Sequence, residues 1–253
     1  MSDLPDRTYF PEQCSGKQQQ IGKVSAQLTL AAAAAFTAGY IILPAVSALL
    51  LPRESMFAGV LAAAGPILSL IILFTLVKRC CGSFRKTMLS LGFRRFPVKT
   101  LFTALPLAAA IMLAGGGITL IWGYIGAKLN IDLGTPPTIE AAMSENIWDV
   151  IALLITALLA APVFEEIFFR RVLYGTLLRF VPLNGAIILT SLAFAAMHMS
   201  PLQLPGLLVI GWIWQTFYLR SQTLWTSVIL HFCNNLIAAT MLLLMRFTEF
   251  TNI

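Results

Sequence analysis

Two adjacent glutamates, Glu165 and Glu166, lie in one of the most apolar stretches of the chain, and Arg170 follows the second by four residues. An ionised carboxylate inside a membrane costs about 2.5 kcal/mol or more, so such residues occur there mainly where they line a cavity or take part in chemistry. The chain has two histidines, His198 and His231, and both also lie in apolar segments. Carboxylates and imidazoles act as general bases and as metal ligands, so these segments hold the candidate site.

The spacing separates the two glutamates. Successive side chains on an α-helix are about 100° apart, so Glu165 and Glu166 point in different directions. Glu166 shares a face with Arg170, with the acid first, and the sequence therefore predicts an ion pair between them. Glu165 is left without a partner in its own helix. Pro162, one turn earlier, lacks a backbone donor and can kink the helix, which would open space beside Glu165.

The other polar side chains lie at similar depths on later helices. At about 1.5 Å of rise per residue, His198 and His231 both come within roughly one to two helical turns of Glu165 in depth. Asn235 follows His231 by four residues and shares its face, and His198 follows Phe194 in the same way. The sequence predicts that the carboxylate, the two imidazoles and the amide meet between three helices, with Phe194 packed beside His198.

This set of residue types suits hydrolysis. A buried carboxylate can act as a general base toward water, a histidine can orient that water, and a histidine with an asparagine can stabilise an oxyanion. On this interpretation no cofactor is expected. The alternative is a zinc site with Glu165, His198 and His231 as ligands, although the chain has no H-E-x-x-H sequence and an asparagine carbonyl is a weak zinc ligand.

The composition indicates that these residues lie in a membrane protein. The chain has 253 residues, of which 58% are hydrophobic and 11% charged, and its mean hydropathy is +0.83. Apolar runs of about twenty residues are long enough to cross a bilayer. We expect an all-α, polytopic transmembrane helix bundle with about seven spans, within a range of about six to eight. The candidate spans are 24–51, 56–77, 100–127, 147–178, 183–200, 205–220 and 223–246.

The basic residues predict the orientation of this bundle. Seven of the seventeen Lys and Arg residues lie in segment 78–99, which contains no acid, so this loop is expected in the cytoplasm together with the N-terminus. Leu89 and Phe93 alternate with these charges, which predicts an amphipathic helix or turn on the membrane surface. The net charge of +6 therefore does not indicate nucleic acid. The expected location is a bacterial inner membrane, and the loop could also contact anionic lipid.

Three short motifs together resemble those of a known family. They occur in order on successive expected helices and are E-E-x-x-x-R (Glu165, Glu166, Arg170), F-x-x-x-H (Phe194, His198) and H-x-x-x-N (His231, Asn235). This combination resembles the CPBP family, which comprises CAAX prenyl proteases of the Rce1 type and bacteriocin-processing and self-immunity (Abi) proteins. Its members are described as intramembrane proteases. The resemblance covers residues 145–246.

The resemblance implies an intramembrane endopeptidase, a hydrolase with an Rce1-like catalytic core. It implies four catalytic residues, which are Glu165 as the base that activates water, His198 as its partner, and His231 with Asn235 as oxyanion stabilisers. It implies structural support from three others, which are Glu166, Arg170 and Phe194. The implied partners are the lipid bilayer and a peptide or protein substrate, with or without a lipid modification.

These inferences divide the chain into four parts, which are a cytoplasmic N-terminal segment 1–23, accessory transmembrane helices 24–144 with the basic loop 78–99, a CPBP-like catalytic core 145–246, and a C-terminal tail 247–253.

Two functions without proteolysis remain open. Buried glutamates and histidines also form proton relays, so one alternative is a proton-coupled transporter. Against it, the polar residues gather at one depth and the chain shows no repeated halves. The other alternative is an immunity protein that keeps the fold without catalysis.

Overall fold

The computed structural model describes residues 15–52, 56–96 and 98–251, and within these ranges it contains helices and no strands. The α-helices are labelled α and the π-helical segments η. In chain order they are α1 (Ser15–Phe36), η1 (Thr37–Ile42), α2 (Leu43–Leu50), α3 (Met56–Cys81), α4 (Phe84–Ser90), α5 (Val98–Lys128), α6 (Pro137–Met143), α7 (Ile147–Ile155), η2 (Thr156–Ala160), α8 (Ala161–Glu166), η3 (Ile167–Leu173), α9 (Tyr174–Leu177), α10 (Leu183–Met197), α11 (Leu204–Ser221) and α12 (Leu224–Thr251).

Two of the long helices change their winding along their length. The helix formed by α1, η1 and α2 is one continuous rod, and the helix Ile147–Leu177 joins α7, η2, α8, η3 and α9. Single π segments inside α-helices add a residue to a turn and are frequent at functional sites. Because Ile147–Leu177 carries both motif glutamates, it is called the catalytic helix below.

The expected polytopic helical bundle is confirmed. Among the described residues, five helices are long and apolar enough to cross a membrane, and they are Ala26–Leu50, Ala64–Cys81, Val98–Lys128, Ile147–Leu177 and Leu224–Thr248. The other two expected spans are helical too, but α10 has 15 residues, or about 22 Å, against a hydrocarbon core of about 30 Å. Its antiparallel partner α11 carries polar Gln215, Thr216 and Arg220.

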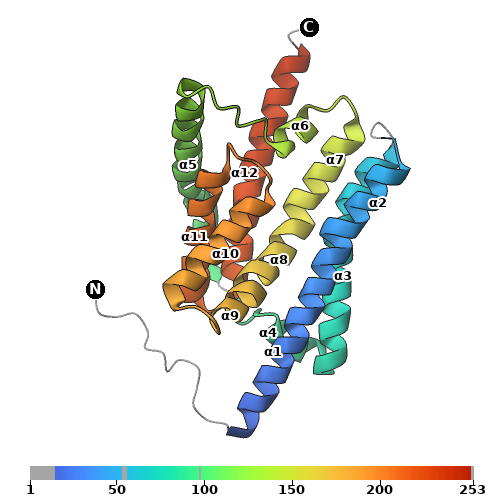
Figure 1. The fold of residues 1–253 in the computed structure, drawn as a ribbon, viewed down its shortest axis with the longest axis vertical. Helices are drawn as coiled ribbons and strands as arrows, with labels where there is room; N and C mark the ends of the chain where they lie inside the picture. Colours follow the sequence, from blue (N-terminus) through green and yellow to red (C-terminus); the bar gives the residue numbers. More distant parts are fainter. Residues whose placement is uncertain (1–14, 53–55, 97, 252–253) are drawn as a thin grey trace, which may run out of the picture.

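The catalytic helix runs through the middle of the bundle (Figure 1). The rod α1–η1–α2 packs on α3 on one side of it, and α3 in turn contacts α7, η2 and α8. On the other side, α12 lies against α5, α11 and α8, while α10 pairs with α11. The helices that carry the histidines therefore reach the catalytic helix from one side, and the first rod reaches it from the other.

Close glycine contacts set the distance between two pairs of helices, one of which includes the first rod. A Cβ atom added to Gly65 of α3 would clash with the carbonyl oxygen of Gly39 in η1, and the same holds for Gly206 of α11 against Gly115 of α5. The hydroxyl of Ser69 also donates to the carbonyl of Ala35 at 2.8 Å. Small residues let membrane helices approach closely where the hydrophobic effect cannot drive their association. The contact at Gly39 fixes the height of its neighbour Tyr40 in the bundle.

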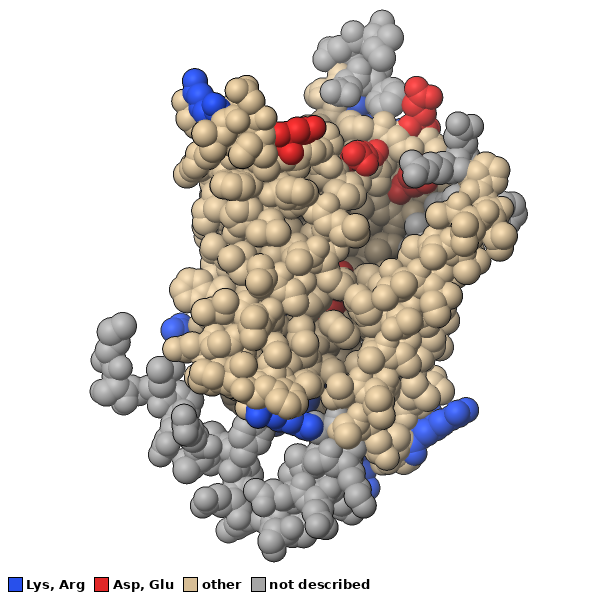
Figure 2. All heavy atoms as spheres, viewed as in Figure 1, with Lys and Arg blue, Asp and Glu red and all other residues tan. Residues whose placement is uncertain are grey.

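The acidic residues gather at one end of the bundle and most of the basic residues at the other, although a basic group also stands at the acidic end, where α5 ends with Lys128 (Figure 2). Basic residues gather at the end formed by α4 and the last turn of α3, which includes Lys78 and Arg79, whereas acidic residues lie near α6 at the opposite end. Residues 82–96 form the short helix α4 followed by a turn, and Leu91 and Phe93 of this turn are buried in the protein core. By the positive-inside rule the α4 end is expected in the cytoplasm. Residues 1–14 of the expected N-terminal segment and 252–253 of the expected tail lie outside the described residues.

Candidate active site

The π segment η2 lies directly before the turn that carries the two glutamates, and its backbone hydrogen bonds differ from those of an α-helix. In η2 the backbone N–H of Ala161 donates to the carbonyl of Thr156, five residues earlier. The next donor in this register would be Pro162, which has no N–H, so the carbonyl of Ala157 loses its partner. The side chain of Asn235 replaces it, because its Nδ2 donates to the Ala157 oxygen at 2.8 Å. A π turn therefore lies directly before Pro162, and Asn235 of α12 binds the carbonyl that this turn leaves without a backbone donor.

Glu166 is the centre of a fully buried polar cluster. Arg170 donates to its carboxylate from Nε at 3.0 Å and from Nη2 at 3.5 Å, so the ion pair predicted from the four-residue spacing is present. His231 Nδ1 lies 3.1 Å from the same carboxylate. The exposed fractions of Glu166, Arg170 and His231 are 0%, 0% and 2%. An ionised carboxylate only accepts hydrogen bonds, so His231 carries a proton on Nδ1 and donates it to Glu166.

Glu165 has a different environment from its neighbour. Its surface is 8% exposed, and the hydroxyl of Tyr40 donates to its Oε1 at 3.4 Å. Its Oε2 lies 4.0 Å from His231 Nε2, which is too long for a direct hydrogen bond but suits a bridging water. Figure 2 shows a hollow between the first rod and the rest of the bundle, with acidic atoms visible at mid-height on its floor. Glu165 is the more exposed carboxylate of the pair, at 8% against 0% for Glu166.

Aromatic rings hold the imidazoles and the guanidinium. The ring of Phe194 lies 4.8 Å from that of His198 and 6.1 Å from that of His231, centroid to centroid, and the Arg170 guanidinium lies 4.9 Å from its centre. The indole of Trp214, on α11, packs on His231 at 4.3 Å. Packing against fixed rings leaves His231 little freedom to turn. Phe194 is thus a shared support of the cluster, as its motif position predicted.

His198 and Asn235 do not meet Glu165 as the depth comparison predicted. His198 lies at the C-terminal end of α10, where its Nδ1 is 2.9 Å from the carbonyl oxygen of Phe194. In the described part of the chain it makes no polar contact with Glu165 or with His231. Asn235 binds the Ala157 carbonyl. Of the predicted group, Glu165 and His231 lie 4.0 Å apart, while the ring of His198 packs on Phe194.

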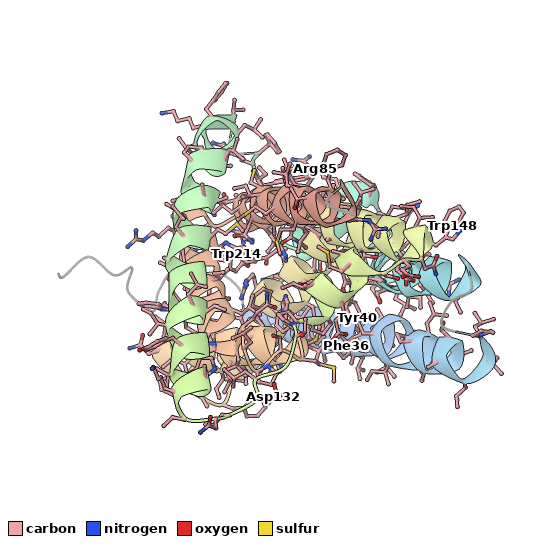
Figure 3. The ribbon with its side chains drawn as sticks, turned by 90° about the horizontal axis from the view of Figure 1, so that it is seen from above. Phe36, Tyr40, Arg85, Asp132, Trp148 and Trp214 are labelled. Atoms are coloured by element: carbon pink, nitrogen blue, oxygen red, sulfur yellow. The ribbon has the colours of Figure 1, made fainter. Side chains whose placement is uncertain are left out.

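The sequence argument missed two side chains of the site, Tyr40 and Trp214. Tyr40 stacks between Phe36 and Phe164, with both centroid distances at 5.3 Å, and Figure 3 shows it beside Phe36 on the first helix. Its signal in the sequence is weak, since it is simply the one tyrosine of the expected span 24–51. Trp214 had none beyond its place in an apolar helix. Both lie outside the three motifs.

The zinc alternative stays a prediction. Across residues 15–52, 56–96 and 98–251, no three or more His, Cys, Asp or Glu side chains form a group that could hold a metal ion. Nδ1 of His198 lies near a backbone carbonyl and Nδ1 of His231 lies near Glu166, which leaves Nε2 of each ring as the nitrogen that could bind a metal. The catalytic steps proposed below use no metal.

Comparison with known families agrees with the motif pattern. Residues 147–237 match the family model described as type II CAAX prenyl endopeptidase Rce1-like. This part of the chain is an Rce1-like domain. The family recognised from the three motifs is thereby confirmed, and the domain implies an integral membrane protein with protease, and hence hydrolase, activity. The matched range includes all seven motif residues but not Tyr40. Comparisons with curated proteins and with solved structures each gave no match.

Proposed function

We propose that the protein is an intramembrane endopeptidase that hydrolyses a peptide bond of a membrane-associated substrate with a water activated by Glu165. One observation carries the proposal. Glu166 binds both Arg170 and His231, which leaves Glu165 facing His231 Nε2 across 4.0 Å. This gap has the size and the two polar partners that a bridging water requires.

The water in this gap is held for attack. When the Nδ1 proton of His231 is donated to Glu166, Nε2 is the acceptor of the ring, so the water donates one hydrogen to Nε2 and the other to Glu165 Oε2. Both of its hydrogens are then engaged, and a lone pair is free to attack the substrate carbonyl carbon. Glu165 takes one proton as the C–O bond forms. It then gives that proton to the amide nitrogen as the C–N bond breaks, which yields a carboxylic acid and an amine.

Three further side chains support these steps. Tyr40 donates to Glu165 Oε1, which leaves Oε2 for the water. Asn235 uses one Nδ2 hydrogen for Ala157, and we assign the second to the oxyanion of the tetrahedral intermediate. The role of water partner, expected for His198, passes to His231 in this proposal. His198 is assigned a positioning role through the ring of Phe194.

The proposed setting is the inner membrane of a bacterium, with the α4 end and the N-terminus in the cytoplasm. The charge separation of the bundle supports the orientation. The proposed substrate is a membrane-associated peptide or protein, and the description of the matched family makes a prenylated C-a-a-X peptide the first to test. The same peptide without its prenyl group tests whether the lipid is needed.

Cleavage by the purified protein in proteoliposomes tests the proposal. A fluorescence-quenched C-a-a-X peptide, with and without a prenyl group, is offered to the wild type and to Glu165→Gln. We expect the variant to lose about 10²- to 10⁴-fold in kcat/KM, the usual contribution of a general base. Glu140→Gln, on the exposed face of α6, is the matched control and should keep full activity. Undiminished cleavage by Glu165→Gln would refute the mechanism.

Three further measurements identify substrates and separate the alternatives. If neither peptide is cleaved, comparison of membrane-peptide profiles between wild-type and Glu165→Gln cells identifies substrates as peptides that lose their fragments in the variant. Zinc bound in stoichiometric amount, and lost together with activity on chelation, would replace the metal-free mechanism. Full complementation by a folded Glu165→Gln protein would indicate an immunity role without catalysis.

A further inference from the structure

An apolar cavity of about 410 Å³ lies between α3, the α4 region and the catalytic helix. Its walls include Ile71 and Phe74 of α3, Met88 of α4, and Val163 and Ile167 of the catalytic helix, and none of its lining residues is charged. The volume lies within the range of roughly 300–1,000 Å³ that is usual for sites of small ligands. The cavity is separate from the polar cluster, although Val163 and Ile167 are close in sequence to the two glutamates.

The depth of the cavity matches the outer part of one membrane leaflet. Its lining on α3 extends from Leu70 to Thr75, and the basic end of the same helix begins at Lys78. At about 1.5 Å per residue, the cavity therefore starts about 4.5 Å from the level of Lys78 and reaches about 12 Å from it. Acyl chains occupy this depth beneath a layer of headgroups.

Exposed basic residues lie close in sequence to the lining of the cavity on both α3 and α4. Arg85 and Lys86 on α4 are exposed, as are Lys78 and Arg79 at the end of α3. Arg85 precedes Met88 by three residues, so the two lie on the same side of α4. Segment 78–99 contains no acid that could neutralise these charges. An uncharged hydrocarbon pocket near these cationic side chains is complementary to a ligand with one apolar chain and one anionic head.

We propose that this cavity binds one acyl chain of an anionic glycerophospholipid from the leaflet at the α4 end, with the headgroup phosphate held by Arg85 and Lys86. The chain would fill the space between α3 and the catalytic helix. Two hydrogen bonds connect this region to elements of the site. Arg171 Nε donates to the carbonyl of Ser90 at 2.9 Å, and the N–H of Leu224, at the start of α12, donates to the carbonyl of Gly92 at 3.0 Å.

Retained lipid is measured by native mass spectrometry on protein extracted from vesicles of phosphatidylglycerol and phosphatidylcholine in equal amounts. This readout needs no protease activity, so the proposal stands or falls independently of the catalytic mechanism. We expect one retained phosphatidylglycerol per wild-type protein. The double variant R85Q/K86Q should lower the preference for phosphatidylglycerol over phosphatidylcholine about 30-fold, the effect of two basic residues near an anionic lipid surface. K99Q/K128Q removes the same charge elsewhere and should keep the preference.

A second pair of variants tests the apolar cavity itself. Ile71→Trp should fill it and abolish lipid retention, and because this residue is 58% exposed the larger ring does not disturb the protein core. Ile67→Trp, one turn away on α3 and outside the lining, is the control and should retain the lipid. Thermal unfolding checks that both variants are folded. Undiminished retention in Ile71→Trp, or equal retention of both lipids by the wild type, would overturn the proposal.

Discussion

The carboxylates on the two sides of the catalytic helix differ in burial and in their hydrogen-bond partners. On the closed side, Glu166 has no exposed surface and two strong donors, Arg170 and His231. On the open side, Glu165 accepts one long hydrogen bond from Tyr40, and its Oε2 lies 4.0 Å from His231 Nε2. A fully paired buried charge holds helices together, whereas an incompletely paired charge beside a hollow is free to act on a water. Adjacent residues of the same type therefore serve structure and chemistry separately.

The largest effect is expected on the free energy of unfolding, when the charge of Glu166 on the closed side is removed. Glu166→Gln leaves the Arg170 guanidinium buried without a counter-ion, which should lower the free energy of unfolding by about 3–5 kcal/mol. Glu165→Gln should change it less, by about 1 kcal/mol, because the contact of Glu165 with His231 Nε2 is long, at 4.0 Å, and its hydrogen bond from Tyr40 is 3.4 Å. Chemical unfolding in detergent micelles measures both. Normal stability with abolished activity in Glu166→Gln would reverse the roles of the two glutamates.

The two histidines give the next largest contrast. His231→Gln removes the Nε2 acceptor from the water and should lower kcat/KM by about 10²-fold, within the usual contribution of a proton-transfer partner. His198→Gln acts only through the packing of Phe194 and should lower it by roughly tenfold or less. Both rings pack on Phe194, so each variant is the control for the other in the same cleavage assay. A larger loss in His198→Gln would restore the role that the sequence predicted for it.

Substitution of Asn235 tests how strongly its hydrogen bond to Ala157 joins α12 to the catalytic helix. Asn235→Ala leaves the buried carbonyl of Ala157 without a donor and should lower the free energy of unfolding by about 1–3 kcal/mol. Pro162→Ala returns a backbone N–H at the position where the π turn lacks one. The double variant should therefore lose less stability than Asn235→Ala alone, and the unfolding free energies of the four proteins form a double-mutant cycle. Strict additivity would show that Pro162 is not the cause.

Tyr40 gives the smallest expected effect and tests the open side alone. Tyr40→Phe removes one neutral hydrogen bond to Glu165, worth about 1 kcal/mol, so kcat/KM should fall roughly fivefold while the stacking on Phe36 and Phe164 remains. Tyr124→Phe is the matched control, because that tyrosine is 65% exposed on α5. Equal activities of the two variants would show that Tyr40, and with it the first rod, does not contribute to catalysis.

The fold was largely predictable because long apolar segments in a bilayer have few alternatives to a helix. The expected spans 56–77 and 100–127, for example, appear as α3 and α5 with ends that differ by a few residues. The short length of α10 was harder to predict from the sequence, because an apolar run of intermediate length can either cross a membrane or pack inside a bundle. The π segment η2 was not predictable either, because it depends on Pro162 together with a distant partner, Asn235.

The sequence by itself determined the relations that lie within one helix. The pairing of Glu166 with Arg170, and the isolation of Glu165 from it, follow from residue spacing, because the backbone of a helix fixes the direction of each side chain relative to its neighbours. The motif pattern also determined the family. Relations between helices were decided only by the tertiary structure, namely that His231 and not His198 lies across from Glu165, that Asn235 supports the π turn, and that Tyr40 reaches the site. These depend on how helices far apart in the chain pack at their glycine and aromatic contacts, and spacing along the chain carries no information about that packing.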